Sequence, residues 1–124
     1  MKLKEFKIQY ALGTIAIDKL QDMAACVDTS KQILTILSTD VNEYIRECVG
    51  YNKNTPIKVL AKLAKDEVWS VKFNVADNPT TPIKILNRLM SAKYSDDNHI
   101  HQILMVSIAS RLFKQSTKNN KGDK

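Results

Sequence analysis

The hydrophobic positions between residues 29 and 90 recur three and four residues apart, which is the spacing of one face of an α-helix. Short polar segments containing Asn, Asp, Thr and Pro separate these clusters, and such residues mark the ends and starts of helices. The pattern therefore predicts an all-α chain of short helices. The clearest predicted apolar stripes are Ile57, Leu60, Leu63 and Ala64 in one helix, and Ile83, Leu86, Leu89 and Met90 in another.

This pattern repeats with a period of 26 residues. Between residues 52–63 and 78–89, seven of twelve positions are identical, including the segment Asn-x-x-Thr-Pro. A weaker copy lies one period earlier, where Thr29, Leu34 and Leu37 align with Thr55, Leu60 and Leu63. Self-similarity at a fixed period of this size is typical of stacked helical repeats. We expect repeats at about 29–54, 55–80 and 81–113.

The Thr-Pro pairs are predicted to start the first helix of each repeat. A threonine hydroxyl can accept a hydrogen bond from a free backbone N–H at a helix start, so Thr55 and Thr81 are predicted N-caps. Pro56 and Pro82 would then occupy the first helical position, where no N–H is needed.

The second helix of each repeat has its own predicted start. Asp66 is predicted to cap one such helix, and Asp40 another, with Glu43 three residues later completing a capping box. Asn52 and Asn78 follow these helices and are expected to close the next turn by bonding nearby backbone groups.

Both ends of the chain depart from the repeat, as expected where an array must close its core. Residues 5–12 and 16–26 are predicted helices within an N-terminal cap, 1–28, the second resembling a degenerate first helix. At the other end Ala92 replaces the capping Asp, and an enlarged loop, KYSDDN, follows.

A long helix from about His99 to Lys114 is apolar almost all round. The stripe formed by Ile100, Leu104, Ile108 and Leu112 is predicted to face the core. Met105 and Val106 then remain to be covered, either by a partner or a second copy of the chain, or by burial against the first helix of the last repeat.

The segment LAKDEVWSVKFNVADNPTTPIKIL resembles the leucine-rich repeat variant family, whose members are bacterial helical solenoids that can look like HEAT-type arrays. The resemblance covers about residues 29–90. The longer period, the absence of an iron–sulfur cysteine cluster and Lys72 in place of Arg depart from the family. With the resemblance, we expect a right-handed α-solenoid of about three helical-pair repeats with capping helices, a single domain over 1–113, followed by a basic disordered tail, 114–124.

The formal net charge of +6 is concentrated at the two ends. Residues 1–10 contribute +2, residues 111–124 contribute +4, and the 22 charged residues between them sum to zero. The N-terminal residues lack the apolar stretch of a signal peptide, and no apolar run approaches a membrane span, so we expect a cytoplasmic protein. In that compartment Cys26 and Cys48 are expected to be free, buried thiols.

The sequence offers no catalytic constellation. His99 and His101 are two residues apart and diverge on a helix, so they do not form a metal-binding pair. No Cys–His or Ser–His–Asp arrangement has support, and the three glycines are scattered rather than gathered in a phosphate-binding loop. We therefore expect no enzymatic activity, no cofactor and no metal.

The strongest candidate site is the outward face of the second helices. Glu43 and Arg46 lie on that face in one repeat, and Trp69, Lys72 and Phe73 stand there in the next. Exposed aromatic side chains beside a cation are typical of interaction hot spots. The alternative is that Trp69 and Phe73 pack in the core, beneath the enlarged third repeat or the C-terminal helix.

These features predict a non-catalytic binding module for a protein or peptide partner, without a membrane. The alternative is a nucleic-acid (DNA) binding protein that uses Arg and Lys on the second helices together with the basic tail. A homodimer through the C-terminal helix is compatible with either function. A run of lysines in the middle repeat either orients a partner or is simply solvated; it consists of Lys53, Lys58, Lys62, Lys65 and Lys72.

Overall fold

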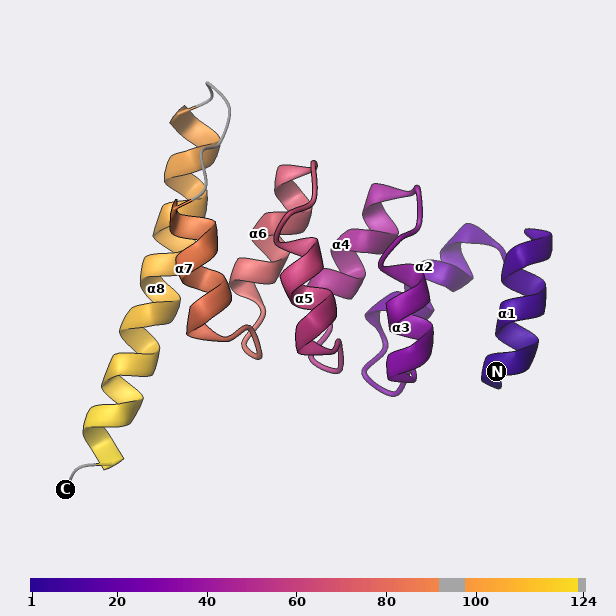
Figure 1. Cartoon of the computed structure of the whole chain (residues 1–124), viewed down its shortest axis with the longest axis horizontal. Coiled ribbons are helices and arrows are strands. Elements are labelled where there is room, and N and C mark those ends of the chain that lie inside the picture. Colours follow the sequence, from indigo (N-terminus) through magenta and orange to yellow (C-terminus); the bar gives the residue numbers. More distant parts are fainter. Residues whose placement is uncertain (92–97, 123–124) are drawn as a thin grey trace.

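The computed structural model describes residues 1–91 and 98–122, and every regular element within them is a helix (Figure 1). The all-α prediction is therefore confirmed for this part of the chain. The predicted enlarged loop, with Ala92 at its start, lies outside the described residues. The helices are α1 (Leu3–Leu12), α2 (Ile17–Ala25), α3 (Lys31–Leu37), α4 (Glu43–Tyr51), α5 (Ile57–Leu63), α6 (Trp69–Asp77), α7 (Ile83–Ser91) and α8 (Asn98–Gly122).

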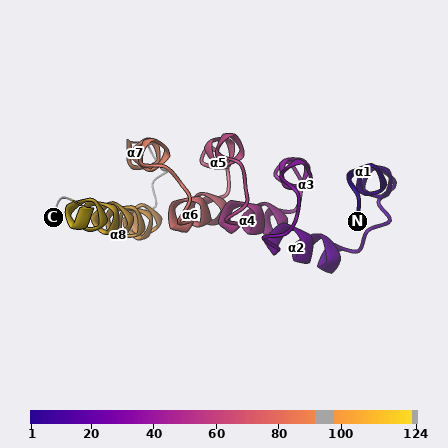
Figure 2. The ribbon, with the colours of Figure 1, turned by 90° about the horizontal axis from the view of Figure 1, so that it is seen from below.

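The helices form two layers with the chain termini at opposite ends (Figures 1 and 2). The first layer holds α1, α3, α5 and α7, and the second holds α2, α4, α6 and α8 (Figure 2). Within the second layer α2 packs on α4, α4 on α6, and α6 on α8. The prediction that α2 is a degenerate first helix is therefore wrong, because it lies beside α4 in the layer of second helices.

The hydrophobic core follows the 26-residue period. Residues at equivalent positions of α3, α5 and α7 are all buried, and each set of three faces the second layer: Ile33, Val59 and Ile85; Leu34, Leu60 and Leu86; Leu37, Leu63 and Leu89. The second layer adds its own equivalent pairs, Ile45 and Val71, and Val49 and Val75.

The predicted stripes were wrong at their first residue, because Ile57 is 59% exposed and Ile83 is 44% exposed. Val59, Leu60 and Leu63 lie within an arc of about 100° around the helix axis, given 100° per residue. Ile57, the first residue of α5, lies outside this arc, so the helix turns it away from the core.

Two buried asparagines join each pair of helices to the preceding pair. The Nδ2 of Asn52 donates to the carbonyls of Ala24 (2.8 Å) and Cys26 (2.9 Å). The Nδ2 of Asn78 makes the same contacts one period later, to Gly50 (2.9 Å) and to the carbonyl of Asn52 (3.0 Å). Their Oδ1 atoms accept from the backbone N–H two residues on. The predicted turn-closing role is confirmed, and the bonds to the preceding helix pair are an addition.

The threonines of the two Thr-Pro pairs, and the equivalent Thr29, bond to the end of the preceding helix instead of starting the next one. The hydroxyl groups of Thr29, Thr55 and Thr81 each donate to the carbonyl six residues earlier, at 2.6, 2.7 and 2.6 Å. The residue at the N-cap of α5 is Pro56, which makes no side-chain cap. The N-cap prediction for Thr55 and Thr81 is therefore wrong. A Thr placed beside the end of the preceding second helix meets carbonyls that lack partners within that helix.

The predicted capping aspartates also lie further from their helices. Asp40 and Asp66 stand two residues before the N-cap and accept from the backbone N–H of Asn42 (2.8 Å) and Val68 (3.0 Å). Asn42 is the true N-cap of α4, since its Oδ1 accepts from the N–H of Tyr44 at 2.9 Å. The capping box with Glu43 is therefore wrong, and each aspartate keeps an oxygen for another partner.

The second helices approach closely at small residues. A Cβ added to Gly50 of α4 would meet the carbonyl oxygen of Val71 and a methyl group of Val75, both at 3.4 Å. Ala24 and Ala76 occupy the equivalent buried positions in α2 and α6. Small side chains at this position therefore let adjacent helices of the second layer pack against each other.

The C-terminal helix follows its predicted core stripe where side chains are described. Leu104 and Ile108 are buried and Leu112 is partly buried against the core. The helix continues past Lys114 to Gly122, in contrast to the disordered tail predicted from residue 114. This segment contains no proline, and adding a residue to an existing helix costs far less than starting one.

Both cysteines are free thiols, but Cys26 is exposed, so the prediction of two buried thiols is wrong for this residue. Cys26 stands one period before Asn52. Asn52 and Asn78, at the equivalent positions of the next two periods, are buried because the preceding pair of helices covers them.

Replacing Asn78 with Ala is expected to lower the free energy of unfolding by about 2–4 kcal/mol, because buried backbone groups would lose their partners. The matched control is Asn87→Ala, an exposed position of α7, where the change should be below about 0.5 kcal/mol. Urea denaturation followed by circular dichroism measures both. Equal unfolding midpoints for the two variants would contradict the role assigned to Asn78.

Tyr10 makes the stability of the N-terminal helix dependent on alkaline pH. The pKa of Tyr10 is raised to about 12. Burial is the largest cause, and the hydrogen bond that the hydroxyl donates to Asp40 is the second. In the unfolded chain a tyrosine pKa is about 10. The neutral phenol therefore stabilises the fold fully below pH about 10, and this stabilisation is lost as pH rises toward about 12.

Tyr10→Phe is expected to be less stable than the wild type at pH 8 by roughly 1 kcal/mol, the usual contribution of one hydrogen bond. The difference should shrink between pH 10 and 12, because only the wild type loses this bond by ionisation. Urea denaturation at successive pH values measures it. A difference that stays constant up to pH 12 would rule out this linkage.

Candidate partner-binding surface of the second layer

A groove opens between α6 and α8 on the second layer, where these helices lie side by side (Figure 2). Its volume is about 560 Å³. Phe73 of α6 and Ile103 and Val106 of α8 supply the apolar lining. The polar lining consists of Asp77, Gln102, Ser107, Ser110, Arg111 and Lys114. We refer to this feature as the α6–α8 groove.

The two aromatic residues singled out in the sequence lie together beside this groove. The rings of Trp69 and Phe73 meet edge to face, with centroids 6.1 Å apart. Phe73 is half-buried and packs against the core, as the core alternative predicted, whereas Trp69 is 41% exposed. Within this pair, Phe73 is therefore anchored against the core, and Trp69 is in contact with water.

Arg46 has a structural role that the sequence did not predict. Its Nε donates to Asp66 Oδ2 at 2.8 Å, and its Nη1 donates to the carbonyls of Asp40 (2.8 Å) and Val41 (3.1 Å). The hydrogen bond with Asp66 raises the pKa of Arg46. These contacts fasten α4 to the segment between α5 and α6, so the guanidinium is engaged within the chain.

The predicted partner face is thus divided by the structure. Lys72, equivalent to Arg46 in the next period, lines a separate cavity of about 310 Å³ together with Lys65 and Arg88. Glu43 is half-buried at the start of α4. The structure brings Trp69 together with Phe73, and it does not join Glu43, Arg46 or Lys72 to the α6–α8 groove.

The two residues proposed on the C-terminal helix also separate. Val106 lines the α6–α8 groove and is 70% exposed, whereas Met105 is half-buried. The sequence placed Val106 and Phe73 in two independent candidate surfaces. The packing of α6 on α8 combines them into one.

Arg111 is the groove residue that sequence reasoning missed. Its Nη2 donates to the carbonyls of Pro79 (2.9 Å) and Thr81 (3.4 Å), which holds α8 against the segment between α6 and α7. Its buried Nε has no hydrogen-bond acceptor among the described residues. The available signal was an arginine three residues after the core residue Ile108, on the inward side of the helix.

A second depression continues the surface toward the N-terminal end. It has a volume of about 530 Å³ and is lined by residues of α4 and α6 that include Glu47, Tyr51 and Asn74. Asp77 borders both this depression and the α6–α8 groove. The second layer therefore carries two adjoining hollows along its outer face.

No helix in the described part of the chain combines the length and apolar character needed to cross a membrane. The same residues contain no cluster of three or more metal-ligating side chains. No family model matches the chain, and comparison with curated proteins and with solved structures gives no match. The resemblance to leucine-rich repeat variant proteins therefore stays a prediction.

Arg46→Ala is expected to lower the free energy of unfolding by about 2–3 kcal/mol, because Asp66 and two carbonyls lose their donor. Arg46→Lys should recover little of this, since an ammonium group cannot reproduce the planar set of donors. Arg88→Ala, at an exposed position of α7, serves as the control and should change the free energy of unfolding by less than about 0.5 kcal/mol. Chemical denaturation measures all three, and full rescue by lysine would contradict the fork-like contact.

Proposed function

We propose that this protein is a non-catalytic binding module whose α6–α8 groove holds a peptide segment of a partner protein. The observation that carries the proposal is the exposed apolar lining of the groove. Val106 and Ile103 leave much of their surface in contact with water, and Trp69 lies beside them through Phe73. Aromatic and aliphatic side chains that surround a hollow are typical of protein-interaction hot spots.

The charges around the groove favour an acidic segment. Arg111 and Lys114 line it with two positive charges, whereas Asp77 supplies one negative charge. The sequence of α8 continues with Lys118 and Lys121. We therefore expect a partner peptide with apolar side chains for the groove and carboxylates near Arg111 and Lys114, because complementary charge aids both encounter and orientation.

The arrangement of helices supports a second part of the proposal, a short right-handed α-solenoid of the leucine-rich repeat variant or HEAT type. Helices alternate between two layers, and buried positions recur every 26 residues. An array of this kind presents one long face on which side chains of successive units form a continuous surface.

A nucleic-acid site on α2, α4 and α6 finds little support. The helices α2, α4 and α6 carry three basic and five acidic residues. Arg46, the only arginine among them, is held by Asp66. On α2, α4 and α6 a peptide partner therefore fits better than a phosphate backbone does.

The test uses peptides selected from a random display library against the wild-type protein. Trp69 is the only tryptophan of the chain, and its ring contacts Phe73, which lines the groove. Its fluorescence should therefore change when a peptide binds in the groove. Val106→Glu should weaken the selected peptides about 30-fold or more, because it places a carboxylate in the apolar lining. Trp69→Ala should weaken binding by a similar factor, measured by calorimetry.

The matched control is Val41→Glu. Val41 is 97% exposed and does not line the α6–α8 groove, so the same substitution there should leave peptide affinity unchanged. Equal loss in the two glutamate variants would overturn the proposal. Sedimentation over a range of concentrations separates peptide binding from self-association through α8, which would give about twice the mass of 14.0 kDa.

A further inference from the structure

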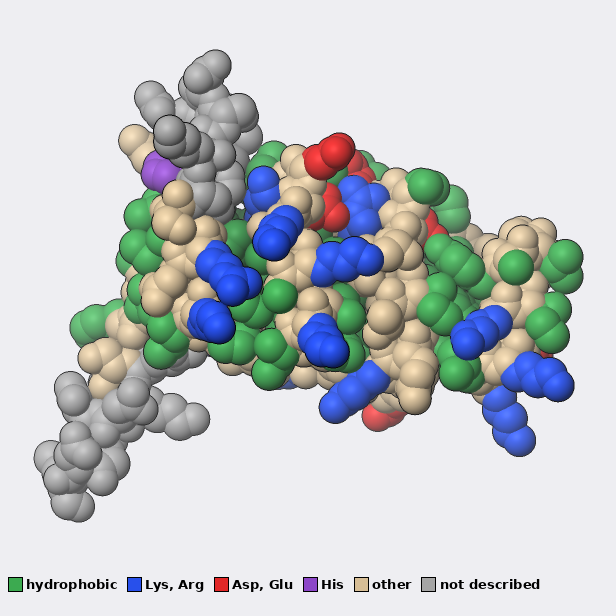
Figure 3. All heavy atoms as spheres, in the orientation of Figure 1, with side chains coloured by type: hydrophobic (Ala, Val, Ile, Leu, Met, Phe, Trp, Pro, Cys, Tyr) green, Lys and Arg blue, Asp and Glu red, His purple; other side chains and the backbone are tan. Residues whose placement is uncertain are grey.

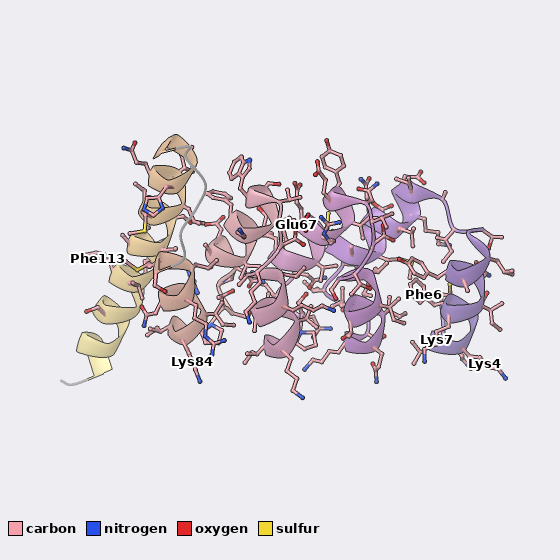
Figure 4. The ribbon with its side chains drawn as sticks, turned by 45° about the horizontal axis from the view of Figure 1, so that its top comes forward. Lys4, Phe6, Lys7, Glu67, Lys84 and Phe113 are labelled. Carbon is pink, nitrogen blue, oxygen red and sulfur yellow. The ribbon has the colours of Figure 1, made fainter. Side chains whose placement is uncertain are left out.

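The first layer differs from the second in charge. Its helices α1, α3, α5 and α7 carry seven basic residues and one acidic residue, a net charge of +6, compared with −2 for α2, α4 and α6. Figure 3 shows this face of the molecule, with Lys and Arg side chains spread over its length. In Figure 4 the side chains of Lys4 and Lys84 extend away from their helices. The helices of the first layer are therefore strongly basic, whereas α2, α4 and α6 of the second layer carry a small net negative charge.

Four of these cations form a regular grid. Lys58 and Lys62 on α5 occupy positions equivalent to Lys84 and Arg88 on α7, one period later. All four side chains are exposed, and none has an ion-pair partner within the described residues. Like charges four residues apart on a helix repel each other and destabilise it. The grid therefore works against folding, and an anionic partner would relieve this repulsion.

The spacing of the grid suits a linear polyanion. Residues four apart lie about 6 Å apart along a helix axis, and the pair recurs on the next helix of the layer (Figure 1). A nucleic-acid duplex carries one phosphate per about 1.7 Å of its axis, so such a grid meets phosphates in any register.

The distribution of aromatic residues favours a duplex over a single strand. Exposed Tyr44, Tyr51 and Trp69 lie on α4 and α6 of the second layer. On the first-layer helices Phe6 is buried and Tyr10 is half-buried and bonded to Asp40. Proteins that bind single strands stack bases on exposed aromatics, and helices that lie on membranes insert aromatic or leucine side chains. The described surface of the grid offers no exposed aromatic for stacking, so it does not suit a single strand. Ile57 and Ile83 are exposed beside Lys58 and Lys84, so an anionic membrane is the competing ligand that the experiment must exclude.

We propose that the first-layer face binds the sugar–phosphate backbone of a double-stranded nucleic acid without base specificity, through Lys58, Lys62, Lys84 and Arg88. Lys31 on α3 extends the same face by one helix. This site uses different helices from the peptide groove, so the two proposals stand or fall separately. A module with both sites would bring a peptide-bearing protein to a duplex.

The experiment measures fluorescence anisotropy of labelled random-sequence 20-base-pair duplexes between 50 and 300 mM salt. Lys58→Gln/Lys84→Gln should weaken binding at least tenfold at low salt and reduce the slope of log affinity against log salt by about 1.8, since each phosphate contact contributes about 0.9. The matched control is Lys19→Gln/Lys53→Gln, which removes the same charge from exposed lysines of α2 and of the segment beside the second depression. It should leave both quantities nearly unchanged.

A second double variant, Lys62→Gln/Arg88→Gln, should lose duplex affinity to a similar extent. Agreement between the two double variants would show that the loss is not caused by misfolding of one of them. Both grid variants should melt at or above the wild-type temperature, because they remove repulsion within the helices. Equal losses in grid and control variants would overturn the proposal, since net charge alone would then explain binding. So would tighter binding of single strands, or of phosphatidylserine vesicles, than of duplexes.

Discussion

The fold depends on how a buried asparagine amide joins one pair of helices to the next. The end of each second helix leaves carbonyl groups without partners, and packing another helix pair against it would bury them. The Nδ2 group of Asn78 carries two N–H donors, and both are used on such carbonyls, while its Oδ1 fixes the turn of its own unit. A hydroxyl or a carboxylate could not supply this combination. The spacing between helix pairs is therefore set by hydrogen bonds as well as by apolar packing.

Because successive helix pairs are evenly spaced, residues one period apart in the sequence lie in a row along the molecule. Positions 26 residues apart become neighbours on the surface, so Lys58 and Lys84 form one row, and the small residues Gly50 and Ala76 another inside the second layer. Core positions of the period, such as Leu34, Leu60 and Leu86, therefore share one buried environment. This is why the basic first-layer helices can differ in charge from α2, α4 and α6 while sharing one hydrophobic core with them.

Local features could be predicted from the sequence, whereas contacts between units could not. The helices and the buried positions Leu60, Leu63 and Val75 follow from spacing along one helix. The partners of Thr55 and Arg46 could not be predicted from this spacing. A Thr-Pro pair is typical of a helix start, so the bond of Thr55 to the preceding helix was not expected. An arginine at an outer helix position is usually in contact with water, so its ion pair was not expected either. Their carbonyl and carboxylate partners lie on neighbouring elements, and only the stacking of those elements shows which side each polar group faces.

The α6–α8 groove arises where the period breaks. One period after Asn78 stands Leu104, which is buried and has no amide to donate. Arg111, on the next turns of α8, binds the carbonyls of Pro79 and Thr81 in its place. Arg111 therefore holds α8 against the segment between α6 and α7 where the period offers no amide. The space left beside Phe73 is then open to a ligand. The proposed binding groove therefore lies where the 26-residue period of the sequence breaks.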